Sequence, residues 1–467
     1  MTTDLWRCGA IELAAMIARR EVSSLEVIDA HLERIEAVNP VLNAIVRVLA
    51  SEARAGAAAA DATLAAGDAV GPLHGVPITV KENIDLAGTP TTSSLVAFAE
   101  AIVTVDAPAV ARMRTAGAIP IGRTNLPDLG LRVATESSLH GITRNPWNHE
   151  LTAGGSSGGE ASSLAAGMSP LGLGNDIGGS LRNPAHCCGI ASIKPSTGVI
   201  PSASVLPPDN LSLMFQLMAV EGVMARRVAD VRAGLIALAG PDVRDPLALP
   251  VSLADLDRGR VLRVAVVTDP PGGSTHPGVS AAIAAAADVL SNLGAEVVAV
   301  TPPSYGRAIE LWSALLMCDL REQLPALEMV MGPDALTFLG YAQQVTPAVS
   351  LTEFSAMLAE RAGVEKEFHG FLSDHDVLLS PTWAHPPFAH GADIASLEGA
   401  QATFDTMRPV LAANLLGLPA AVVPVGMADG MPVGAQIIGR RFADLRCLSV
   451  AQLLEDAYGV LTPIDPR

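Results

Sequence analysis

Hydrophobic and polar positions follow helical and strand periods in alternating stretches of the chain. Across residues 9–38, apolar side chains recur every three or four positions, and Ser23 and Glu26 fit a capping box at a helix start. Short apolar runs bounded by glycine, proline or polar residues are typical of buried strands. The pattern predicts helices at 9–38, 53–67, 107–117, 160–168 and 281–294, and strands at 76–80, 118–125, 261–267, 295–300, 377–382, 420–425 and 433–439.

Strands that alternate with helices indicate an α/β chain. We predict a single large domain whose mixed β-sheet core is covered by helices on both faces. No internal repeat or low-complexity linker divides the sequence. We expect N-terminal helices over about 1–65, a catalytic core over about 66–240 and 371–467, and a variable helical, substrate-side region over about 241–370.

Three further segments affect this picture. Residues 201–260 are rich in proline and loop residues, and residues 302–370 are mostly helical in pattern, so either could cover a site. The longest uncharged apolar run, 409–428, has a length that could suggest a membrane span. Prolines and glycines interrupt it, so we interpret it as a buried strand flanked by turns.

Composition excludes some partners. The 467 residues are 49% hydrophobic and 17% charged, which allows a large packed core. The formal net charge of −18 argues against nucleic acid and against an anionic membrane surface as partners. Five cysteines, an odd number without a C-x-x-C pair, favour a reducing cytosol and no structural metal. The N-terminal stretch lacks a signal-peptide pattern, so we expect a cytoplasmic protein.

The glycine-rich stretch LTAGGSSGGE, residues 151–160, contains a G-x-S-x-G match centred on Ser157. An α/β-hydrolase places this motif directly after an apolar strand, but here WNHELTA precedes it. A phosphate-binding Walker loop needs Lys and Ser or Thr after its glycines, and Glu160 stands there instead. Neither the hydrolase-elbow nor the phosphate-loop interpretation fits well.

A second glycine-rich serine occurs in NDIGGSLR, residues 175–182. Successive backbone amides in such a turn can converge on one point and bind an anion. The amides of Ile177, Gly178, Gly179 and Ser180 are therefore candidate donors of an oxyanion hole around a nucleophilic Ser180.

A serine hydroxyl needs a base to become a nucleophile. Lys81, at the end of the predicted strand 76–80, could be that base if burial lowers its pKa enough to leave the amine neutral. Ser156 could pass the proton between Lys81 and Ser180. Only the fold could bring these residues together, because Lys81 and Ser180 are 99 positions apart.

These motifs together resemble the amidase signature family. The similarity covers most of the chain in the family's order, and the 24-residue step from Ser156 to Ser180 also fits it. The matching stretches are GPLHGVPITVKENIDLAGTPTT, DAPAVARMRTAGAIPIGRTNLPD, NPWNHELTAGGSSGGEASSLAAGM, GLGNDIGGSLRNPA, IKPSTG and NLLGLPAAVVPVGMADGMPVGAQIIGR.

The resemblance implies a Ser–cis-Ser–Lys triad. Ser180 would be the nucleophile, Ser156 the bridging serine after a cis peptide bond from Gly155, and Lys81 the general base. Ser157 would be a supporting hydrogen-bonding residue. The expected reaction is acyl transfer from an amide through an acyl-enzyme, with no metal and no cofactor.

Six further residues have expected or candidate roles. Gly130 and Leu131 would border the acyl pocket and, with Ser156, contact the substrate. We interpret Asp176 and Arg182 as an ion-paired scaffold for the nucleophile loop, since arginine cannot act as a base. Trp383 and His385 follow a predicted strand and either line a pocket or pack within their loop.

The expected function is an amidohydrolase that cleaves a small carboxylic amide to an acid and ammonia or an amine. One alternative is the A subunit of a tRNA-dependent amidotransferase. Its tyrosine-rich pattern is poorly matched by KPSTGVIPSAS and the chain's three tyrosines. The other alternative is a non-catalytic binding protein of the same fold, which the intact triad disfavours. An apolar surface stretch could support a homodimer.

Overall fold

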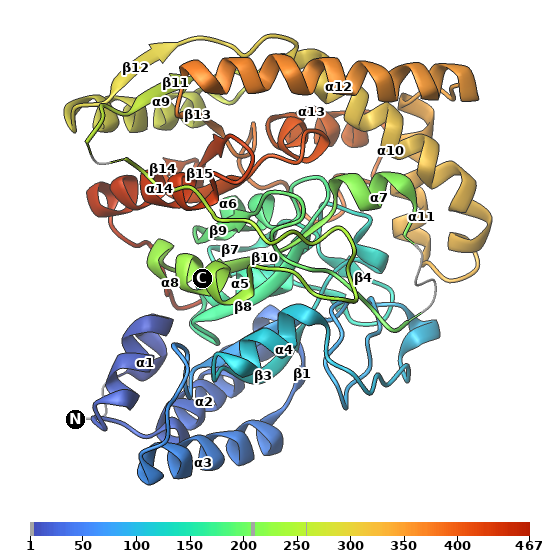
Figure 1. Ribbon diagram of the computed structural model, residues 1–467. Helices are drawn as coiled ribbons and strands as arrows, with labels where there is room; N and C mark the ends of the chain where they lie inside the picture. Colours follow the sequence, from blue (N-terminus) through green and yellow to red (C-terminus); the bar gives the residue numbers. More distant parts are fainter. Residues whose placement is uncertain (1–3, 207–210, 258) are drawn as a thin grey trace.

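The computed structural model describes residues 4–206, 211–257 and 259–467. The first residues of the N-terminal stretch and part of the proline-rich segment 201–260, both considered above, lie outside these ranges. The described chain forms one α/β unit built around a large mixed sheet, as predicted (Figure 1).

The sheet has eleven strands within the described residues. Strand β2 is parallel to β3 and β8, and β11 is parallel to β12 and β13. Antiparallel pairs connect these two groups, and β1 pairs antiparallel with β3 at one edge of the sheet. In spatial order the strands are β1 (Ile45–Val48), β3 (Ile119–Thr124), β2 (Pro77–Lys81), β8 (Leu171–Asp176), β10 (Val220–Ala225), β9 (Ala191–Lys194), β14 (Ala420–Ala428), β15 (Met431–Gly439), β13 (Val377–Pro381), β11 (Arg263–Val266) and β12 (Glu296–Ala299).

Helices cover both faces of this sheet (Figure 1). One layer contains α1 (Ala10–Ala18), α4 (Pro108–Thr115), α8 (Val228–Leu238), α9 (Pro277–Asn292) and α14 (Asp444–Tyr458). The opposite layer contains α5 (Gly158–Ala165), α6 (Arg182–Cys188) and α13 (Leu397–Leu415). Outside α13 lie α7 (Leu213–Met218), α10 (Tyr305–Leu327), α11 (Pro333–Val345) and α12 (Leu351–Asp374), whereas α2 (Ser24–Leu42) and α3 (Ala50–Ala66) cover the edge near β1 and β3.

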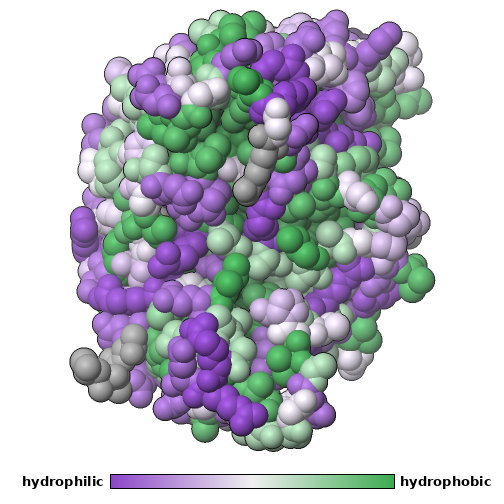
Figure 2. Space-filling view, turned by 60° about the vertical axis from the view of Figure 1, so that its left-hand side comes forward, coloured by the Kyte–Doolittle hydropathy of each residue, from purple (hydrophilic) through white to green (hydrophobic). Residues whose placement is uncertain are grey.

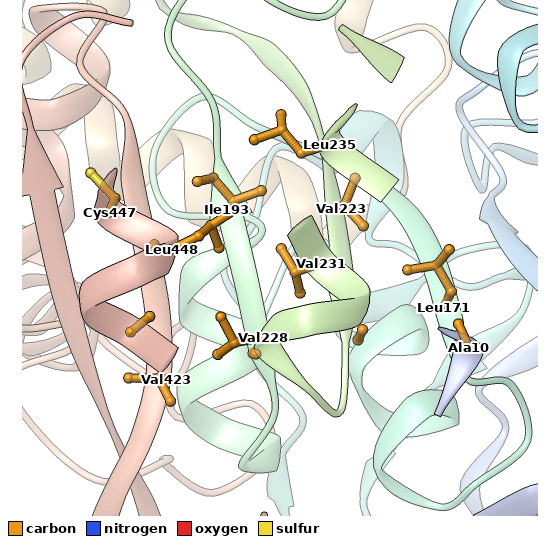
Figure 3. Close-up of a cluster of buried hydrophobic side chains, with 14 of the residues drawn as sticks. Ala10, Leu171, Ile193, Val223, Val228, Val231, Leu235, Val423, Cys447 and Leu448 are labelled. Carbon is orange, nitrogen blue, oxygen red and sulfur yellow. The ribbon is translucent and has the colours of Figure 1, made fainter. Parts of the chain in front are cut away.

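Small aliphatic side chains form the core between these layers, as the low aromatic content requires. Figure 3 shows Ile193 of β9 and Val223 of β10 among Val228, Val231 and Leu235 of α8. All five side chains have no exposed surface. Because strand side chains alternate between faces, each central strand contributes to both layers.

Most predicted elements are present within a few residues of their expected bounds, but one segment holds elements that were not predicted and one interpretation is wrong. The proline-rich segment 201–260 contains the central strand β10 as well as α7 and α8. The run 409–428 is not one strand with flanking turns, because residues up to Leu415 complete α13 and only Ala420–Ala428 form β14. Both halves of this run are buried, which explains its uniform apolar character.

Among the described helices, none combines the length and apolar character needed to cross a bilayer. Figure 2 shows one face of the molecule, where hydrophobic residues form separate groups among hydrophilic ones.

Candidate active site

The sheet brings the two halves of the site together. Strands β2 and β8 are parallel neighbours, with Val80 opposite Leu173, so their carboxyl ends meet at the same edge. Lys81 is the last residue of β2, and the loop that carries Ser180 follows directly from Asp176 at the end of β8. The fold therefore closes the long sequence separation between Lys81 and Ser180.

Lys81 is fully buried and contacts the expected bridging serine. Its Nζ atom lies 2.8 Å from Oγ of Ser156 and 2.7 Å from Oδ1 of Asn175. Burial lowers the pKa of Lys81 to about 7, although the negative charges of Glu221, Asp176 and Glu160 act in the opposite direction. A substantial neutral fraction of the amine, which a general base needs, is therefore present near neutral pH.

Ser156 lies in a closely packed loop. The peptide bond between Gly155 and Ser156 is cis, as the resemblance implies. A Cβ atom on Gly155 would lie 2.6 Å from the carbonyl carbon of Val133, so only glycine fits against that backbone. The Thr135 hydroxyl donates to the Gly154 carbonyl at 2.8 Å and fixes the loop from the other side.

The two glycine-rich loops are joined through their backbones. The amide of Ser157 donates to the carbonyl of Ser180 at 3.2 Å, and the Ser157 hydroxyl lies 3.5 Å from the carbonyl of Asn175. Within the described residues, no hydrogen bond joins the hydroxyls of Ser156 and Ser180. Ser157 thus joins the loop of Ser156 to the loop of Ser180.

The loop around Ser180 presents backbone amides. Those of Ile177, Gly178 and Ser180 have no acceptor among the described protein groups. The Gly179 amide donates to Oδ1 of Asp176 at 2.8 Å, in contrast to our expectation that all four amides are available. The Asp176 carboxylate therefore occupies the Gly179 amide and fixes the turn. The other three amides are free to donate to a ligand.

Asp176 and Arg182 form the expected ion pair, with both side chains fully buried and an N–O distance of 2.9 Å. Arg182 also donates to Oε1 of Gln436 and to the Val410 carbonyl. Asp176 additionally accepts from the Leu181 amide at 3.1 Å. The pair therefore connects the loop of Ser180 to β15 and α13.

A cavity of about 580 Å³ opens beside Ser180, whose side chain is 6% exposed. Gly130 and Leu131 line it, in the place predicted for them, and a Cβ atom on Gly130 would lie 3.2 Å from Oγ of Ser156. Most other wall residues are apolar and come from α10, α11 and α13: Trp312, Leu316, Met317, Leu320, Phe338, Leu339, Ala342, Phe404, Met407 and Leu411.

Sequence reasoning missed these wall residues. Their helical period could have shown that they lie on an apolar face, but not that this face borders a cavity. Trp383 and His385, which were considered for this role, do not line the cavity. Trp383 is fully buried, so its loop-packing interpretation is the correct one.

The arginines at the cavity already have partners. Arg132 is held by Asp393 through two hydrogen bonds, of 2.6 and 2.7 Å. Arg408 donates to Asp269 and to three other oxygen atoms of the chain. Two exposed acidic residues, Glu310 and Asp405, also line the cavity. This arrangement offers no unpaired cation to an anionic ligand within the described residues.

The chain is similar to known proteins along most of its length. The sequence model of the family described as Amidase matches residues 26–448. The chain belongs to the amidase family. An indoleacetamide hydrolase of Bradyrhizobium diazoefficiens is 38% identical over 98% of this chain and 88% of its own. An acylamidase of Rhodococcus erythropolis is 35% identical over 96% of this chain and 94% of its own.

Two further similarities extend this comparison. The A subunit of the glutamyl-tRNA(Gln) amidotransferase of Salinispora arenicola is 33% identical over 99% of both chains. A solved 6-aminohexanoate cyclic dimer hydrolase with bound substrate superposes with a TM-score of 0.84, at 29% identity and 98% coverage of both chains. This amidase-family chain is an enzyme that hydrolyses carbon–nitrogen bonds of linear amides.

Proposed function

We propose that Ser180, Ser156 and Lys81 carry out this hydrolysis as nucleophile, proton relay and general base. The observation that carries the proposal is the buried contact between Lys81 and Ser156, beside a cavity that ends at Ser180. Neutral Lys81 takes a proton from Ser156, and Ser156 takes one from Ser180 as the Ser180 oxygen attacks the amide carbonyl. The relay requires the Ser180 hydroxyl to turn toward Ser156.

The tetrahedral intermediate needs donors for its oxyanion. The amides of Ile177, Gly178 and Ser180 supply them, while Asp176 and Arg182 keep the loop in shape. The relayed proton returns to the leaving nitrogen, the carbon–nitrogen bond breaks, and ammonia or an amine departs. Water then attacks the Ser180 ester by the same route and releases the acid.

The substrate we propose is a small neutral amide with a bulky apolar acyl group, either aryl or alkyl. The apolar wall of the cavity supports this, since burying such a group contributes about 25 cal/mol per Å² of apolar surface. Free glutamine, which the glutaminase subunit of an amidotransferase must bind, carries a carboxylate and an ammonium group. Arg132 and Arg408 already have partners, and Asp405 at the cavity wall would repel the carboxylate. We therefore favour a free-standing amidase.

A panel of amides scored by ammonia release tests this proposal. Phenylacetamide and hexanamide should be hydrolysed with higher kcat/KM than acetamide, and glutamine should be the poorest substrate. Glutamine as the best substrate, together with co-purification of a tRNA-binding partner, would favour the amidotransferase alternative. No hydrolysis of any amide, ester or anilide would favour a non-catalytic protein.

We further propose a cytoplasmic enzyme. Its five cysteines are free thiols, and burial raises the pKa of the Cys187 thiol, which makes it unreactive. A homodimer remains our proposal for the assembly, and light scattering of the purified protein would decide it. We also propose that residues 241–370 determine the substrate, because α10 and α11 supply much of the cavity wall.

A further inference from the structure

Trp312 of α10 contacts the loop that carries the oxyanion donors. Its indole Nε1–H donates to the carbonyl of Ile177 at 2.9 Å. Its ring also covers Gly178 so closely that a Cβ atom there would lie 2.5 Å from Cζ2. The side chain is 8% exposed and faces the cavity beside Ser180. One residue therefore touches both the cavity proposed to hold the acyl group and the backbone of the donor loop.

Because the peptide unit is planar, the contact of Trp312 with the Ile177 carbonyl also fixes the direction of the next amide. The carbonyl of Ile177 and the amide N–H of Gly178 belong to one planar group, and that peptide bond is not among the cis bonds of the chain. In a trans peptide the C=O and N–H point in opposite directions. A donor that fixes the Ile177 carbonyl therefore fixes the direction of the Gly178 N–H, one of the three available amides.

The loop has few other anchors at this point. Asp176 holds the amides of Gly179 and Leu181, which lie beyond the peptide in question. Gly179 has a φ of +100°, so the backbone here has access to conformations closed to other residues. Without the indole donor, the Ile177–Gly178 peptide would be held only by packing.

We propose that Trp312 is a positioning residue for the oxyanion hole, in addition to being a wall of the acyl cavity. It orients the Gly178 amide through the Ile177 carbonyl, and accepting this hydrogen bond also polarises the peptide and strengthens its N–H as a donor. The inference rests on the proposed function, because it assumes that Ser180 attacks the amide at this loop. A helix of the variable region thereby contributes to transition-state stabilisation.

The variant Trp312→Phe tests this role because it keeps an aromatic ring but removes the N–H. With phenylacetamide as substrate we expect kcat to fall about tenfold, the effect of losing one well-placed hydrogen bond, while KM changes less than about twofold. Benzylboronic acid, which forms a tetrahedral adduct with a nucleophilic serine, should bind more weakly by the same factor as the fall in kcat. A residue that only lines the pocket would instead change KM.

Tyr305→Phe is the matched control. Tyr305 lies on the same helix and donates to the Pro409 carbonyl at 3.1 Å, so this variant also removes one buried hydrogen bond from α10. It should keep the wild-type kcat, because its bond does not reach the donor loop. Equal losses of kcat in both variants would indicate a loosened helix and overturn the proposal.

Ser180→Ala separates this inference from the function on which it rests. An inactive Ser180→Ala enzyme beside a Trp312→Phe enzyme with wild-type kcat and wild-type affinity for benzylboronic acid overturns the positioning role alone. An active Ser180→Ala enzyme overturns the proposed function and the positioning role together. Thermal melting of each variant confirms that the compared enzymes are folded.

Discussion

The amine of Lys81 and the hydroxyl of Ser156 lie 2.8 Å apart in a region from which solvent is excluded. Burial lowers the pKa of the amine to about 7. A base must be unprotonated, so kcat/KM for a neutral amide should rise as pH increases through about 7 and level off above it. A rate profile between about pH 5 and 9 measures this directly.

Lys81→Met should remove that rising limb and lower kcat/KM by about 10²- to 10⁴-fold, the usual contribution of a general base. The Met side chain fits the buried site without a charge. Wild-type activity of this variant near neutral pH would show that another group is the base.

Glu221 of β10 provides a second test of the same base. It lies opposite Asn175 of β8, and its negative charge raises the pKa of Lys81. Burial raises the pKa of Glu221 itself to about 7, so its negative charge is fully present only above that pH. Glu221→Gln removes the charge, so the pKa of Lys81 should fall and the rising limb of kcat/KM should move to lower pH. Glu296→Gln, at an exposed position of β12, is the control and should leave the profile unchanged. A shift to higher pH in Glu221→Gln would contradict this electrostatic account.

The same residue shows why part of the fold could not be predicted. Strand β10 reads VEGVMA, in which Glu221 and Gly222 interrupt the apolar pattern of a buried strand. Glu221 is tolerated there because it lies near Lys81, and Gly222 because a side chain would collide with Leu181. These reasons involve residues far apart in sequence, and a local pattern does not contain them.

The residues proposed for catalysis are marked more clearly in the sequence than the cavity is. Ser156 and Ser180 lie in glycine-rich loops, and Lys81 ends a short apolar strand, so local sequence marks all three. Trp312 and Phe338 lie on helices whose apolar faces look like ordinary core positions. Whether such a face meets another helix or an empty space depends on how the helices pack.

Ser180→Ala should abolish turnover without unfolding the protein, because it removes one oxygen from a side chain at the cavity wall. Ammonia release measures the loss, and circular dichroism checks the fold. Ser157→Ala is the comparison: its backbone link to Ser180 survives, so we expect a smaller decrease. Turnover by Ser180→Ala above the blank rate would identify a different nucleophile.

The Asp176–Arg182 pair should matter for stability. Burial raises the pKa of Asp176, but the charge and hydrogen bonds of Arg182 outweigh this and hold the pKa well below its usual range. The pair therefore stabilises the fold above the unfolded pKa of about 3.9, and this contribution is lost as pH falls through the lower folded pKa.

Arg182→Met should lower the free energy of unfolding by about 3–5 kcal/mol near pH 7, because it leaves a buried carboxylate unpaired. Urea denaturation measures the change. Glu360→Gln, which breaks the exposed pair with Arg307, is the control and should cost less than about 1 kcal/mol. A similar small cost for Arg182→Met would show that the ion pair is not a scaffold.

The cavity wall should control which acyl groups are accepted. Leu316 lies on α10, is 7% exposed and lines the cavity together with Met317 and Leu320. Leu316→Trp adds volume that must project into this space, because the other side of the helix is packed. We expect kcat/KM to fall at least about tenfold for phenylacetamide and hexanamide but less than about threefold for acetamide, since a short acyl group does not reach the new ring.

The control Leu316→Met conserves the side-chain volume and should leave kcat/KM for long and short amides within about twofold of the wild-type values. Equal losses for long and short amides would mean that the acyl group binds elsewhere, and the proposed substrate class would then be wrong.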